Sequence, residues 1–221
     1  MFNLFKKNKP QKPVTIRDTL FGDMPASEWP RGDEAAAEPW SSFVRARNLL
    51  DGGDKPSAIK AYQAITETAG LESRQYLQAW HFLRQLGVNP PAEKAKIVYG
   101  VVVEVGLEKG VDILAAYTDY TARYLNFSGA GEIWERPNSS LDGQIQALLE
   151  AGQKVANVIG PWEQERPEAP TNGNVRLNML TPGGLHFGYG GFKTLSNDPM
   201  GKSLIDPATQ LMLKLTQLGR K

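Results

Sequence analysis

Hydrophobic and polar positions follow two different periods along this chain, and the change of period divides it into two parts. Between residues 39 and 91, apolar side chains recur every three or four positions, which is the spacing of one face of a helix. From residue 97 onward, β-branched and aromatic residues form short runs separated by turns, which is typical of strands. The pattern therefore predicts a helical part followed by a part built on an antiparallel sheet.

Three helices are expected in the first part. The first carries apolar side chains from Trp40 to Leu50 and ends at a pair of glycines. The second begins after Asp54, a favourable N-cap residue. The third breaks at Gly87. Each has one apolar face, so we expect the three helices to pack as a layer.

The clearest strand signal lies between Ile97 and Trp134. Turns divide this segment into three strands, which we place at 97–107, 111–117 and 121–127, and a bulge or bend is expected before Glu132. The first strand is so apolar that we expect both of its faces to be buried. This meander predicts the core of the sheet.

A helix, a hairpin and a second helix complete the pattern. The first helix follows Ser139 or Ser140 and ends at Gly160, and residues 161–174 read as a surface loop. Two alternating strands flank residues 181–184, which fit a type II turn with glycine at its third position. The last helix is expected to start with Asp206 as N-cap and to end before Gly219.

The element order is therefore three helices followed by βββ-α-ββ-α. The simplest assembly is an α+β fold in which an N-terminal helical layer packs on a five-stranded antiparallel sheet with two covering helices. This order resembles the topology of profilin-like and roadblock/longin-like interaction domains, a resemblance of topology alone that does not imply a function. The expected organisation is a flexible basic tail (1–13), an extended arm (14–38), a helical subdomain (39–91) and an α/β sandwich domain (95–219).

Charge and composition narrow the class of function. The net charge is +1, and subtracting the four lysines of the first twelve residues leaves −3 for the rest, so we expect no nucleic-acid partner. The chain has no cysteine, which excludes disulfides and thiolate chemistry. No apolar segment has the length of a membrane span or an export signal, so we expect a cytoplasmic protein. The basic tail could touch a membrane surface, and we rank this reading last.

The motifs that come closest to known chemistry each fail at a defined residue. Residues 196–203 approach a phosphate-binding Walker A loop, but Ser196 stands where that motif needs glycine. The S-x-x-K pattern of serine β-lactamases is matched by Ser57 and Lys60, yet Leu195 occupies the position of the glycine in the third motif. No metal or cofactor pattern is present, so we expect no cofactor.

Two hypotheses of function remain. The leading one is a non-enzymatic protein-interaction or regulatory module that binds a protein partner or a second copy, with Trp29 and Tyr120 as candidate partner-binding aromatics. The alternative is a small-ligand-binding protein or a hydrolase with its site in the glycine-rich hairpin at 183–192. The residues expected at that site are Gly183, Gly184, His186 and Tyr189, with Asp119 or Glu132 as further polar contacts.

Overall fold

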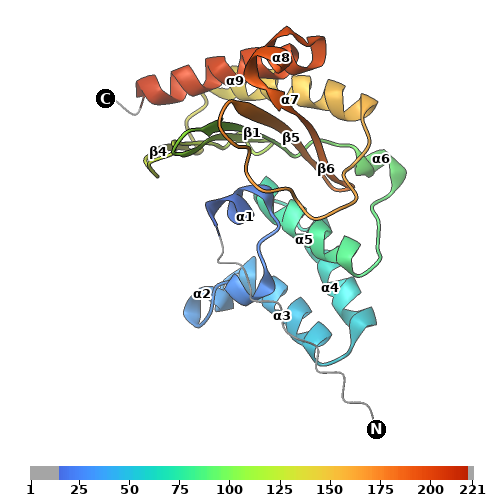
Figure 1. The fold of residues 1–221 in the computed structure, drawn as a ribbon. Coiled ribbons are helices and arrows are strands. Elements are labelled where there is room, and N and C mark those ends of the chain that lie inside the picture. Colours follow the sequence, from blue (N-terminus) through green and yellow to red (C-terminus); the bar gives the residue numbers. More distant parts are fainter. Residues whose placement is uncertain (1–14, 219–221) are drawn as a thin grey trace.

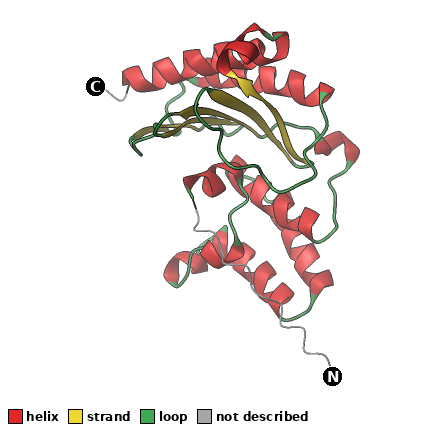
Figure 2. Cartoon of the chain, viewed as in Figure 1, coloured by secondary structure: helices red, strands yellow, loops and turns green. Residues whose placement is uncertain are grey.

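The computed structural model describes residues 15–218, and it is an α+β fold in which helices precede a single antiparallel sheet (Figures 1 and 2). The predicted basic tail, residues 1–13, lies outside the described residues. The N-terminal helices are α1 (Ile16–Phe21), the 3-10 helix η1 (Ala26–Glu28), α2 (Asp33–Ala36), α3 (Trp40–Asp51), α4 (Lys55–Glu67), α5 (Ser73–Gln85) and α6 (Ala92–Ala95). The later helices are α7 (Asp142–Val158), α8 (Phe192–Asn197) and α9 (Pro199–Leu218).

The sheet has six strands in the order β4-β3-β2-β1-β5-β6, and every neighbouring pair is antiparallel. The strands are β1 (Gly100–Leu107), β2 (Gly110–Tyr117), β3 (Ala122–Leu125), β4 (Gly131–Trp134), β5 (Asn174–Thr181) and β6 (Gly184–Gly191). The α+β class and its two covering helices are confirmed, but the sheet has six strands rather than five. The extra strand is β4, because the Asn126 side chain accepts from the Ser128 and Ala130 amides and turns the chain back along β3.

Different helices pack on the two faces of the sheet (Figure 1). On one face, α7 and α9 pack their apolar sides on alternate residues of the central strands, such as Val101 and Leu177. On the other face, α1 and α5 contribute Leu20 and Leu77, which pack on Val102. Strand β1 is therefore buried on both faces over residues 100–104, as its apolar run predicts.

The N-terminal arm docks on the rest of the chain. Its apolar side chains Leu20, Phe21 and Trp29 are all buried, which the sequence predicts. The backbone of this arm differs from the expected extended form, because α1, η1 and α2 occupy much of it. At the end of α1, Gly22 takes φ +64° and packs its backbone against α5. Helix α1 of the arm thus lies on the sheet beside α5, whereas α2 packs beside α3 (Figure 1).

Two predicted local features are wrong. The last helix begins at Pro199 rather than after Asp206, because the chain carries the Asp-Pro start signal twice and the first copy is the one that is used. Asp198 accepts from the Gly201 amide at 2.8 Å, and Pro207 lies inside the helix. The predicted end at Gly219 lies outside the described residues. In the turn between β5 and β6 the positive φ belongs to Gly184 (+132°) and not to Gly183, so the turn is not type II.

Candidate functional site

The β5–β6 hairpin carries the predicted ligand-binding residues, and the structure distributes them over different surfaces. Gly183 and Gly184, in and just after the turn, line a cleft of about 440 Å³. His186 points to the face covered by α7, whereas Tyr189 projects from the opposite face and is 49% exposed. The hairpin therefore presents a turn, a buried face and an outer edge.

His186 is enclosed rather than open to a ligand. The ring is 1% exposed, and Nδ1 lies 3.2 Å from the carbonyl oxygen of Ile159, just after α7. Burial lowers the pKa of His186 below its usual range, so the imidazole is neutral near pH 7. Its proposed polar companions lie elsewhere: Glu132 is on β4, at the far edge of the sheet, and Asp119 accepts from the Ser73 amide at the start of α5. The structure does not bring these three residues together.

The two candidate partner-binding aromatics pack inward. Trp29 is 2% exposed and forms edge contacts with Phe43 and Phe82, at centroid distances of 5.3 and 4.9 Å. Tyr120 takes a positive φ of 62° at the β2–β3 turn, packs against the sheet core and lies under the Arg136 guanidinium at 4.7 Å. Both aromatic rings therefore contribute to packing within the chain.

The outer edge of β6 carries main-chain groups without partners. The Leu180 carbonyl accepts from the Tyr99 N–H, so the main-chain groups of Leu180 point away from β6. Leu180 and Leu185 lie opposite each other, and they therefore form a non-hydrogen-bonded pair. Because this pattern alternates along an antiparallel ladder, the N–H and C=O groups of Leu185, Phe187 and Tyr189 point outward. Trp162 confirms the direction, since its N–H donates to the Leu185 carbonyl from outside at 2.6 Å.

Beyond Leu185 the outer edge of β6 has free main-chain groups, and the strand itself carries no lysine, arginine or acid. Within residues 15–218, the outward main-chain groups of Phe187 and Tyr189 form no hydrogen bond. Strand β6 is eight residues long and contains no proline, lysine or acid, the residues that usually protect an edge strand. Gly188 has open space where a Cβ would lie. On the other face, the Arg176 guanidinium lies over the Phe187 and Tyr189 rings at 5.3 and 5.0 Å.

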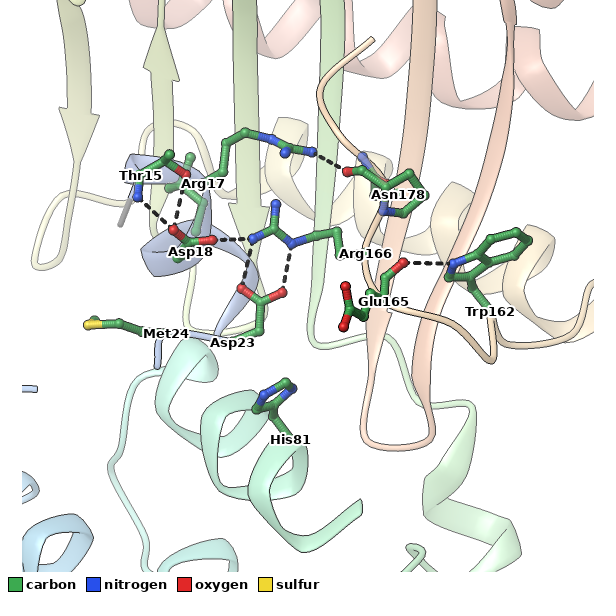
Figure 3. Close-up of polar contacts among 12 residues, drawn as sticks. Thr15, Arg17, Asp18, Asp23, Met24, His81, Trp162, Glu165, Arg166 and Asn178 are labelled. Atoms are coloured by element: carbon green, nitrogen blue, oxygen red, sulfur yellow. Dashed lines mark hydrogen bonds and ion pairs between the residues drawn. The ribbon is translucent and has the colours of Figure 1, made fainter. Parts of the chain in front are cut away.

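A cleft of about 440 Å³ adjoins the turn of this hairpin. One wall is α5, with Leu77, His81 and Arg84, and the opposite wall is the loop at 161–166. Figure 3 shows Arg166 between Asp18 and Asp23, with His81 on the neighbouring helix α5. Arg166 donates to both oxygens of Asp23, at 2.6 and 3.0 Å, and also to Asp18. The loop is thereby fixed to the N-terminal arm.

A second buried polar cluster lies on the same side of the sheet and was missed by sequence reasoning. Glu104, on the central strand β1, is fully buried and accepts from Arg17 at 2.6 Å and from Asn178 at 3.2 Å. The Arg176 guanidinium lies 3.7 Å from the same carboxylate. The signal that could have revealed it is one acid inside an otherwise apolar strand, since a buried charge needs a partner.

Several polar side chains of the described residues are already engaged in contacts within the chain. No three His, Cys, Asp or Glu side chains gather within residues 15–218 in a way that could hold a metal ion. Among the residues that line the cleft, Asp23 is held by Arg166, and the hydroxyl of Thr181 donates to the Gly184 carbonyl. In this part of the chain no helix is long and apolar enough to cross a bilayer.

Comparison of the chain with protein-family models, with curated proteins and with solved structures finds no match.

Proposed function

We propose that this protein is a non-enzymatic interaction module that binds an extended segment of a partner protein along the outer edge of β6. The observation that carries the proposal is the row of outward main-chain groups at Phe187 and Tyr189, which have no partner among the described residues. An added strand would supply those hydrogen bonds and become the seventh strand of the sheet.

The surroundings of this edge favour a particular kind of segment. On one face, a partner side chain would lie beside the Phe187 and Tyr189 rings, which favours an aromatic or aliphatic residue. On the other face, the space next to Gly188 admits a large side chain from the opposing strand. The preferred segment therefore has bulky apolar residues at alternating positions.

The chain itself uses the first part of the same edge. Trp162 pairs with Leu185 through the backbone and places its ring 5.2 Å from Phe187, so one short piece of extended chain already occupies the start of β6. The remaining edge, residues 187–191, accommodates a segment of about five residues. An extended partner segment fits this limited length, and the proposal takes the protein to act in the cytoplasm, as its sequence predicts.

Selection from a display library of random octapeptides on the purified full-length chain tests the proposal. We expect enriched peptides with alternating bulky apolar residues, whose binding weakens at least tenfold in Tyr189→Lys, because a lysine beside Arg176 adds charge and removes the aromatic surface. The matched control is Ile133→Lys, since Ile133 is 64% exposed on the opposite edge strand β4 and its replacement should leave binding unchanged.

Three outcomes contradict the proposal. The first is that no peptide is enriched, and the second is that both lysine variants bind selected peptides equally well. The third is a concentration-dependent dimer in sedimentation experiments that Tyr189→Lys abolishes, which would assign the edge to a second copy of the chain.

A further inference from the structure

A cation without a carboxylate partner faces the cleft beside the β5–β6 turn. Arg84 lies on α5 and donates from Nη1 to the Pro182 carbonyl, in the turn itself. Within residues 15–218 Arg84 forms no ion pair, although its side chain lies largely inside the protein and burial lowers its pKa to about 10. A partly desolvated guanidinium with unused donors is a strong binding group for an anion.

Asp23 attracts Arg84 electrostatically, but the two form no ion pair among the described residues. Arg166 holds both oxygens of Asp23 and also bonds Asp18, so these acids are already paired. Glu163 and Glu165 lie on the exposed loop at the rim. They make the electrostatic potential at the entrance more negative, which disfavours ligands with two or more negative charges.

Two neutral polar side chains adjoin Arg84 on the same helix. His81 is one turn earlier, and burial lowers its pKa to about 4, so the ring is uncharged at neutral pH. Gln85 Nε2 lies 2.9 Å from His81 Nε2, so the amide donates to the imidazole and keeps a second N–H. That N–H can contribute to an anion held by Arg84.

The remaining wall of the cleft is apolar. It includes Phe21, Leu77, Leu180, Leu185 and Trp162, whose ring is 39% exposed. A volume of about 440 Å³ lies within the range of small-molecule sites. We propose that this cleft binds a small monocarboxylate with an aromatic or branched aliphatic body, whose carboxylate is held by Arg84 and Gln85 and whose body packs on Leu77, Leu180 and Trp162.

This site adjoins the outer edge of β6 through Trp162, whose ring lies 5.2 Å from Phe187. The carboxylate is assigned to Arg84 and Gln85 on α5, outside that edge, so Arg84→Gln tests the cleft without altering the edge. The probe is 3-phenylpropionate, and its matched neutral control is 3-phenylpropanol, which has the same apolar body. Titration of the wild-type full chain, followed by NMR, should shift the Arg84 Nε–H and the Trp162 indole N–H signals. The acid should bind at least tenfold more tightly than the alcohol.

Two variants test whether the Arg84 guanidinium causes the preference for the acid over the alcohol. Arg84→Gln should bind the acid and the alcohol with equal affinity, whereas Arg136→Gln, which replaces an exposed arginine outside the cleft, should retain the preference. If Arg84→Gln does not fold, the comparison of acid and alcohol on the wild-type chain still decides the question. Equal binding of the two probes, signal shifts confined to other residues, or stronger binding of inorganic phosphate than of 3-phenylpropionate would each overturn the proposal.

Discussion

Arg17 Nε lies 2.6 Å from Glu104 Oε1, and this pair joins the first helix to the central strand of the sheet across 87 positions of sequence. The Glu104 side chain is fully buried and that of Arg17 is 11% exposed, so water screens the pair little. Asn178 adds a third group to the same carboxylate. The arm is therefore held by polar contacts under the sheet as well as by Leu20 and Phe21.

Replacement of Glu104 by leucine should destabilise the protein by about 3–5 kcal/mol, because Arg17 and Arg176 would remain buried without their carboxylate. Urea unfolding measures the change, and limited proteolysis after Arg17 should become faster as the arm detaches. The matched control is Glu135→Leu, which removes the partner of Arg123 at 59% exposure and should cost at most about 1 kcal/mol. Equal losses in the two variants would contradict the role given to Glu104.

Gly22 should be the glycine of the arm that is least tolerant of alanine. It combines φ +64° with close contacts, because a Cβ there would lie 2.7 Å from the Arg74 carbonyl oxygen and 2.8 Å from Leu77 Cβ. We expect Gly22→Ala to cost at least about 2 kcal/mol in urea unfolding. Gly53→Ala is the control, since φ is +85° but the space is open, and about 1 kcal/mol of backbone strain is expected. A smaller loss at Gly22 than at Gly53 would show that α1 does not pack on α5 as described.

Stability should fall as the pH drops below about 6.5. Burial lowers the pKa of His81 from 6.5 to about 4, so the unfolded chain binds more protons than the folded chain between these values. The stability that comes from keeping His81 neutral is fully present above pH 6.5. It falls as the pH drops from 6.5 toward about 4, and about 2 kcal/mol is lost by pH 5. His186 acts in the same direction, because burial also lowers its pKa.

Urea unfolding from pH 7.5 to pH 5 tests this dependence above the range in which most carboxylates titrate. His81→Gln should remove most of the loss, and His186→Gln should remove a further part. A wild-type stability that is flat or rises over this interval would contradict the burial of neutral imidazoles.

Gly188→Val should stabilise the protein and weaken the docking of a partner segment. A Cβ at this strand position meets no atom within 4 Å, so valine can gain about 0.5–1 kcal/mol from a less flexible backbone and a better strand propensity. A rise in melting temperature of a few degrees is expected. Gly106→Val, whose Cβ would lie 2.1 Å from the Thr171 carbonyl oxygen, should instead unfold the protein more easily. Loss of stability at Gly188 would mean that the space beside β6 is already filled.

Local signals in the sequence predicted the helices and strands, whereas contacts between distant segments determine how these elements pack. Asp54 caps α4 through the Ser57 amide, as its position suggested, because a cap depends only on neighbouring residues. The two Asp-Pro pairs near 198 and 206 carry the same local signal, so sequence could not choose between them. The face on which His186 lies relative to α7 was likewise undecidable, since alternation separates two faces without saying what covers each.

The two surfaces that we propose depend on the order of strands and on contacts between distant segments. Nothing in the sequence of β6 shows that it is an edge strand, because edge position follows from the order of all six strands. The cleft joins α5 to the 161–166 loop, and Arg166 reaches Asp23 across 143 positions. The sequence hypothesis placed a site in this glycine-rich hairpin, and the structure shows that the ring of His186 is enclosed there.

The most direct test of the central proposal is amide hydrogen exchange at Phe187 and Tyr189, measured by NMR with and without a selected octapeptide. In the free protein these two outward amides should exchange faster than those of His186 and Gly188, which bond to β5. Saturation with peptide should slow both outward amides at least tenfold while Ile133, on β4, is unchanged. Binding of the peptide without added protection at Phe187 and Tyr189 would contradict strand addition at β6.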